Sequence, residues 1–100
     1  MAYMVVKMDK TDVGKAKRIL NDDLLSRQSA TIRDGGAIGQ DDSSSFVILE
    51  GAEEAIEKAV EMFRSEGVGS ILDGEEKEKI YNLIKEEEES SMAGMGAIFG

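Results

Sequence analysis

The 100-residue sequence contains no histidine, no cysteine and no proline. Without histidine and cysteine, the chain lacks imidazole bases, thiolate nucleophiles, disulfides and the nitrogen and sulfur ligands of zinc or haem. Without proline, the native state has no slow prolyl switch. Catalysis would require paired carboxylates or an activated lysine, and no spacing in the sequence singles out either. We therefore expect a protein that is not an enzyme and holds no metal and no cofactor.

The sequence also lacks a long apolar run. A membrane-spanning helix needs about 20 consecutive apolar residues, and no stretch of this chain approaches that length. Residues 1–7 lack the charged segment and the long apolar segment of a secretion signal. We expect a cytoplasmic protein with no membrane span.

Acidic side chains outnumber basic ones, and the excess lies in the second half of the chain. The net charge is −9, from 12 basic and 21 acidic residues. Residues 1–50 are nearly neutral, whereas residues 51–100 carry most of the excess acid. A negative field repels nucleic acid and anionic membranes. The expected partner is therefore a protein, including a second copy of the chain, or a small molecule.

The length and composition predict one globular domain. A chain of this mass buries about 65% of its surface on folding, which is enough for a core. The composition, 41% apolar and 33% charged, is globular. We expect a domain over residues 1–89, followed by a flexible tail over residues 90–100 that is rich in glycine and methionine.

Strand and helix patterns alternate along the predicted domain. Apolar runs and alternation predict strands at residues 3–8, 29–33, 46–49 and 68–72. Apolar residues spaced by three and four predict helices at residues 11–25, 52–66 and 75–89. The glycine-containing segment 35–39 is either a mobile loop or a bulged extension of the second strand through Ile38.

The element order predicts an α+β, ferredoxin-like fold. The order βαββαβ closes into a four-stranded antiparallel sheet with two helices on one face, and a C-terminal helix follows. Alternation places Met4, Val6 and Met8 toward these helices. The third strand contributes to the other face either Phe46 with Ile48 or Val47 with Leu49.

The other face of the sheet is the first candidate interaction surface. Its predicted residues are Tyr3, Val5, Lys7, Thr31 and Arg33. An apolar patch of this kind is usually covered. The cover is a partner subunit, the third helix, the tail or a ligand, and the sequence does not choose among them.

The tail offers a second candidate interaction surface. Met92, Met95 and Phe99 have the adaptable and aromatic character of a short docking segment. Glu86–Glu89 place negative charge at the end of the third helix, which opposes the helix dipole and predicts fraying there. The alternatives are a disordered tail and a tail that packs on its own domain.

The segment Asp12-Val13-Gly14 follows the first predicted strand and begins the first helix. It resembles the strand-to-helix entry of ACT-type regulatory domains, which share the βαββαβ order. The resemblance implies an amino acid bound near Asp12, Val13 and Gly14 at a subunit interface. In physical terms, Gly14 allows a ligand to approach the exposed amides of the helix N-terminus.

Taken together, these patterns predict a small, soluble, non-catalytic regulatory or protein-interaction module. It would act through the second sheet face or the tail. The alternative is an ACT-like domain that binds a small molecule. An RNA-binding sheet face would need central aromatics in a basic surround, and the acidic second half argues against one.

Overall fold

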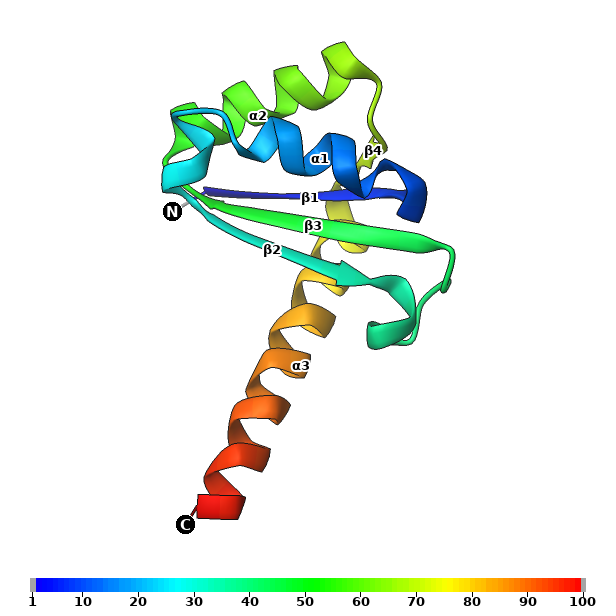
Figure 1. Ribbon diagram of the computed structural model, residues 1–100, viewed down its shortest axis with the longest axis vertical. Helices are drawn as coiled ribbons and strands as arrows, with labels where there is room; N and C mark the ends of the chain where they lie inside the picture. Colours follow the sequence, from blue (N-terminus) through cyan, green and yellow to red (C-terminus); the bar gives the residue numbers. More distant parts are fainter. Residues whose placement is uncertain (1, 100) are drawn as a thin grey trace.

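A four-stranded antiparallel sheet forms the centre of the protein in this computed structural model (Figure 1). The structure describes the backbone of residues 2–99 and the side chains of residues 2–89. The strands are β1 (Ala2–Asp9), β2 (Ser29–Asp34), β3 (Ser44–Gly51) and β4 (Ser70–Ile71). Their order across the sheet is β2-β3-β1-β4, so β2 and β4 are the two edges. The predicted α+β class and antiparallel sheet are confirmed.

Three helices flank the sheet. They are α1 (Val13–Leu20), α2 (Glu53–Glu66) and α3 (Gly74–Phe99). Figure 1 shows α1 and α2 on one face of the sheet, and α3 starting on the opposite face. Three short 3-10 turns join elements: η1 (Lys10–Asp12), η2 (Leu25–Arg27) and η3 (Gly35–Ile38).

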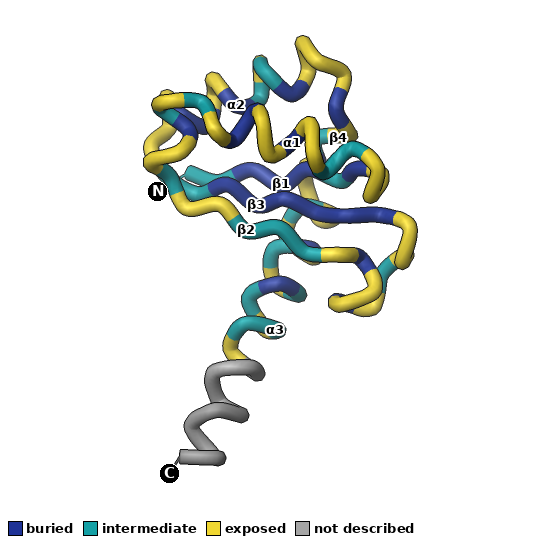
Figure 2. Tube along the Cα trace, in the orientation of Figure 1, coloured by how far each residue is buried: buried dark blue, intermediate teal, exposed yellow. Residues whose placement is uncertain are grey.

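The face toward α1 and α2, called here the first face, carries the larger apolar core. Met4, Val6 and Met8 of β1 lie in it, as the alternation predicts. They pack with buried residues of both helices and with two residues of β3. These are Ala16, Ile19, Leu20, Ala55, Ile56, Ala59, Phe63, Val47 and Leu49. Figure 2 shows the buried positions concentrated in β1, β3 and the inner sides of the helices.

The opposite face, called here the second face, carries a smaller apolar cluster. The register pairs Val5 with Ile48 and Lys7 with Phe46, so Phe46 and Ile48 are the pair that lies on this face. Ile80 and Ile84 of α3 pack against them. The third helix is therefore what covers this face, and its central apolar residues are not open to a partner.

The first helix is shorter than its apolar spacing predicts. It ends at Leu20 rather than near Leu25, and Leu25 instead lies buried in η2. The Asp22 carboxylate accepts hydrogen bonds from the backbone N–H groups of Leu24 and Leu25, at 3.0 and 3.3 Å. A side chain that binds the backbone in this way offers an alternative to helical hydrogen bonds. The prediction was wrong because apolar spacing continued past this local cap.

The loop after β2 also differs from one of its two predicted forms. Gly35–Ile38 form a 3-10 turn, so the strand does not continue through Ile38. A Cβ on Gly35 would meet the backbone oxygen of Asp41, which requires glycine there. By contrast, Gly67 ends α2 at φ 66°, as predicted.

The last part of the chain was predicted as a flexible tail over residues 90–100. The backbone of α3 is helical over Gly74–Phe99. The candidate docking residues Met92, Met95 and Phe99 lie outside the side chains that the structure describes.

Candidate functional site

The register brings the residues predicted for the second face together. Thr31 of β2 pairs with Ile48 of β3, and Ile48 pairs with Val5 of β1. In the same way, Arg33 pairs with Phe46, and Phe46 pairs with Lys7. The register therefore places these residues on one face, and the third helix, one of the four predicted covers, lies over its centre. Val5 is wholly buried, since α3 lies over it.

Aromatic and charged side chains surround the apolar contact between α3 and the second face. The rings of Tyr3 and Tyr81 lie 4.4 Å apart, centroid to centroid. Lys77 Nζ lies 4.3 Å from the centre of the Tyr3 ring, and Lys85 Nζ lies 5.4 Å from that of Tyr81. A cation over an aromatic face is attracted by the ring quadrupole. The helix is therefore held by polar contacts as well as by apolar burial.

Glu50 of β3 links these groups electrostatically. Its Oε1 atom is buried and lies 3.0 Å from Lys85 Nζ, which balances its charge although no hydrogen bond of good geometry reaches it. The Glu50 carboxylate beside Lys85 Nζ raises the pKa of Lys85, and burial opposes this rise. The same carboxylate, followed by burial, raises the pKa of the Tyr81 hydroxyl. Both shifts favour the protonated forms, so their effect falls in the alkaline range, above the usual pKa values of 10.0 and 10.5.

Arg33 connects α3 with the edge strand β2. Its Nε atom lies 2.7 Å from Glu87 Oε2, and its Nη2 atom lies 3.5 Å from Glu88 Oε1. Its Nη1 atom donates a hydrogen bond to the backbone oxygen of Ile32 at 3.0 Å. The guanidinium group thus bonds both to α3 and to the backbone of its own strand, β2.

The outer edge of β2 has no strand beside it in the part of the chain that the structure describes. In an antiparallel sheet, the N–H and C=O of one residue point to the same neighbouring strand, and consecutive residues alternate. Leu72 N–H donates to Val5 O at 2.9 Å, so the backbone N–H and C=O of Val5 point toward β4. Those of the next residue, Val6, therefore point toward β3. Val6 pairs with Val47, whose backbone groups point back to β1, so those of Ile48 point to β2. Ile48 in turn pairs with Thr31. Thr31 therefore points inward, toward β3.

At alternate positions of β2, the backbone N–H and C=O groups point outward in the plane of the sheet, away from β3. By the same alternation, these are Ala30, Ile32 and Asp34, whose backbone donors and acceptors line the outer edge. Ala30 and Asp34 are exposed, and Ile32 is half-buried. Natural edge strands are commonly protected by lysine, proline or a bulge. The strand β2 has none of these. Its edge is protected instead by the hydrogen bond that Arg33 donates to the Ile32 backbone oxygen. Figure 1 shows β2 along one side of the sheet.

Asp12, Val13 and Gly14, the residues of the ACT-like resemblance, lie where η1 passes into α1. A Cβ on Gly14 would meet no atom within 4 Å, so the space beside it is open. The Asp12 side chain makes no helix-capping hydrogen bond and lies 3.8 Å from Lys15 Nζ. At this helix start Gly14 is exposed, whereas Asp12 and Val13 are half-buried.

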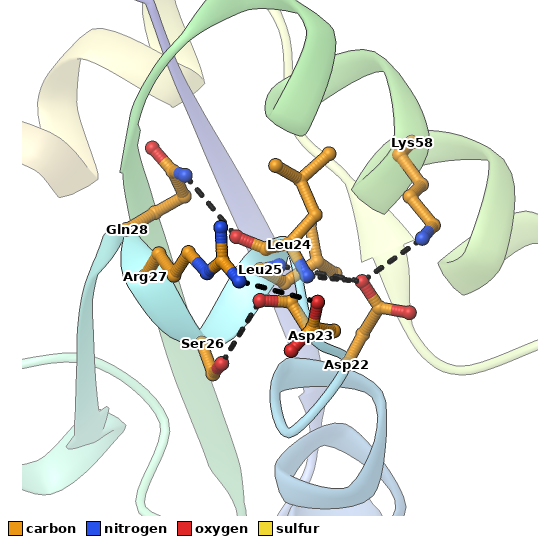
Figure 3. A network of polar contacts seen from close by, with 8 residues as sticks. All are labelled: Asp22, Asp23, Leu24, Leu25, Ser26, Arg27, Gln28 and Lys58. Atoms are coloured by element: carbon orange, nitrogen blue, oxygen red, sulfur yellow. Dashed lines mark hydrogen bonds and ion pairs between the residues drawn. The ribbon is translucent and has the colours of Figure 1, made fainter.

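The polar network around Asp22 is a structural link rather than a site. Figure 3 shows Lys58 of α2 reaching Asp22, with an Nζ to Oδ2 distance of 3.0 Å. The hydrogen bond from Lys58, opposed by burial and aided by the amides of Leu25 and Leu24, lowers the pKa of Asp22. These contacts tie the segment between α1 and β2 to α2.

Two hollows lie on the described surface. One hollow of about 130 Å³ lies beside β4 and is lined by Phe63, Arg64, Val68, Gly69 and Ile71. A larger one, of about 320 Å³, lies on the outer side of α2 and is lined by Lys58, Glu61, Met62, Ser65 and Glu66. Among the described residues, no group of three or more acidic side chains is arranged to hold a metal ion. Within the same residues, no helix combines the length and apolar content needed to cross a bilayer.

Sequence reasoning missed the outer edge of β2 as a candidate site. It identified the strand, and it named Thr31 and Arg33, but these residues point their backbone groups inward. The outward residues Ala30 and Ile32 could be recognised only once the strand order was known. The available signal was a run of four uncharged residues, Ser29–Ile32, with neither lysine nor proline in it.

Comparison with known proteins gave no further assignment. The chain matches no protein-family model, no curated protein and no solved structure.

Proposed function

We propose that this chain is a non-catalytic protein-interaction module that binds an extended polypeptide segment along the outer edge of β2. The observation that carries the proposal is the row of outward backbone groups at Ala30, Ile32 and Asp34. An extended segment that lies beside such an edge adds a strand to the sheet, and backbone hydrogen bonds supply much of the affinity. We further infer that the fold is ferredoxin-like, which the βαββαβ order and the strand order β2-β3-β1-β4 support.

A non-catalytic role agrees with the chemistry of the described side chains. The raised pKa values of Tyr81 and Lys85 both come from Glu50, which is part of the contact between α3 and the sheet. The lowered pKa of Asp22 comes from its contacts with Lys58 and with two backbone amides. The lowered pKa of Asp41 comes from hydrogen bonds donated by the backbone N–H and the hydroxyl of Ser43. Each of these four groups therefore has a structural explanation that needs no substrate.

The test is selection of ligands from a display library of random linear peptides, followed by titration into isotope-labelled protein. We expect the selected peptides to shift the amide signals of Ala30, Ile32 and Asp34. Ala30→Pro removes one outward N–H group, and we expect it to abolish these shifts while the circular dichroism spectrum is retained. The matched variant Ala30→Val keeps the N–H group and should keep binding.

Two results would contradict this proposal. One is a library that yields no peptide acting on β2. The other is binding that Ala30→Pro leaves intact. Free amino acids added to the same labelled sample test the ACT-like alternative. Shifts confined to Asp12, Val13 and Gly14 would support that alternative instead.

A further inference from the structure

We propose that the strand added along β2 belongs to a second copy of this chain, which lies antiparallel to the first across a two-fold axis at Ile32. This inference rests on the proposed function, because it uses the same outward backbone groups of β2. It goes further by naming the partner and the register. The two sheets would join into one continuous sheet through their β2 edges.

The alternation of backbone groups restricts the possible registers. Across an antiparallel pair, outward residues must oppose outward residues for their hydrogen bonds to form. A two-fold axis at Ile32 meets this condition, because it opposes Ile32 to itself and Ala30 to Asp34 of the second copy. An axis at Thr31 also meets it, but then Asp34 opposes Gln28, which lies outside the strand. The Ile32 axis therefore pairs every outward residue of the strand.

The side chains of β2 are compatible with pairing to themselves. Ile32 is half-buried against the core of the first face, and its counterpart across the axis would extend that core. Arg33 would oppose Thr31 of the second copy, and Asp34 would oppose Ala30. Like charges directly opposite each other destabilise a strand pair, and this register has none. The side chains of β2 therefore fit against the same side chains of a second copy in this register.

The charge distribution also permits two acidic chains to meet at β2. The strand belongs to the nearly neutral half of the chain and carries one cation and one anion of its own, Arg33 and Asp34. The Arg33 guanidinium already donates to Ile32 O. A carbonyl oxygen has two lone pairs, so it can also accept a bond from the second copy.

Sedimentation equilibrium over a concentration series into the high micromolar range tests the association. We expect a dimer fraction that increases with concentration and also with added salt, because salt screens the repulsion between two chains of net charge −9. Ala30→Pro should be monomeric throughout, whereas Ala30→Val should dimerise as the wild type does. A wild type that stays monomeric overturns the inference, as does a dimer that persists in Ala30→Pro.

Disulfide formation tests the register, and the chain has no cysteine of its own to interfere. Paired Cα atoms at an Ile32 axis lie about 5.5 Å apart, within the range that a disulfide bridges. We expect Ile32→Cys to form a disulfide-linked dimer under mild oxidation and Thr31→Cys to remain unlinked. The reverse result overturns the register, and a dimer in which neither variant links overturns the β2 contact.

These outcomes are separable from a failure of the proposed function. A wild type that is monomeric but binds selected peptides at β2 loses only the second-copy partner. A chain that neither dimerises nor binds peptides at β2 loses both proposals.

Discussion

The two faces of the sheet are closed by different physical means. On the first face, α1 and α2 bury a large cluster of aliphatic side chains and one phenylalanine, Phe63. On the second face, the described side chains of α3, up to residue 89, place only Ile80 and Ile84 fully into a smaller cluster. Around that cluster, ring contacts and ion pairs complete the contact, including Arg33 with Glu87.

This difference has a cause in the helix sequences. The apolar residues of α2 recur on one continuous stripe, which supplies a broad surface for the sheet. In α3 the stripe is interrupted after Ile84 by the acidic residues 86–89. Apolar burial scales with area, whereas partly exposed ion pairs contribute little and are screened by salt. We therefore expect the first face to dominate stability and the second face to respond more strongly to solution conditions.

The largest expected effect is on the first face. Phe63 is 1% exposed, so Phe63→Ala leaves a cavity and should lower the free energy of unfolding by about 3–5 kcal/mol. The matched change on the second face, Ile84→Ala, should cost about 2 kcal/mol, because α3 packs from one side and can close part of the gap. Urea unfolding followed by circular dichroism measures both. An Ile84→Ala loss as large as that of Phe63→Ala would remove the contrast between the faces.

The two faces should also weaken at opposite ends of the pH scale. On the second face, Tyr81 and Lys85 have pKa values raised above their usual 10.0 and 10.5. The folded state holds these protons more tightly, so stability is complete below about pH 10 and falls as the pH rises through the raised values. Asp22, on the side of α1 and α2, has a pKa lowered from its usual 3.8. Its contribution is complete above that pH and is lost as the pH falls through the lowered value.

Urea midpoints measured across the pH range distinguish these two contributions. Glu50→Gln should reduce the alkaline loss, because Glu50 is the first cause of both raised pKa values. Asp22→Asn should reduce the loss of stability at acid pH and leave the loss at alkaline pH unchanged. If either variant changes the acid and the alkaline loss of stability equally, the titrating groups are not confined to the faces assigned here.

The smallest expected effect concerns the ion pairs of Arg33. Its side chain is 32% exposed, as are those of its acidic partners to a similar degree, so Arg33→Gln should lower stability by at most about 1 kcal/mol. The difference from wild type should shrink in about 1 M salt. Arg27→Gln is the control, since Arg27 is 71% exposed and pairs with Asp23, four residues earlier in the chain. Equal losses in the two variants would show that the contact with α3 adds nothing.

Local pattern was sufficient for most of the fold. Period-two alternation in β1 placed Met4, Val6 and Met8 on the correct face, and Gly67 marked the end of α2. The errors occurred where a side chain or a close approach overrides pattern. Asp22 ended α1 early, and the contact between Gly35 and Asp41 turned the chain into η3. Apolar spacing does not record either interaction.

By itself, the sequence determined most element types, the sides of β1 and β2 and the exclusion of histidine and cysteine chemistry, because these follow from residue identity and nearby spacing. Only the tertiary structure decided that α3 covers the second face and that β2 lies at an edge with Ala30 and Ile32 pointing outward. Strand order arises from contacts between residues far apart in the chain. For that reason, the backbone groups left without a partner become identifiable only once the whole sheet has assembled.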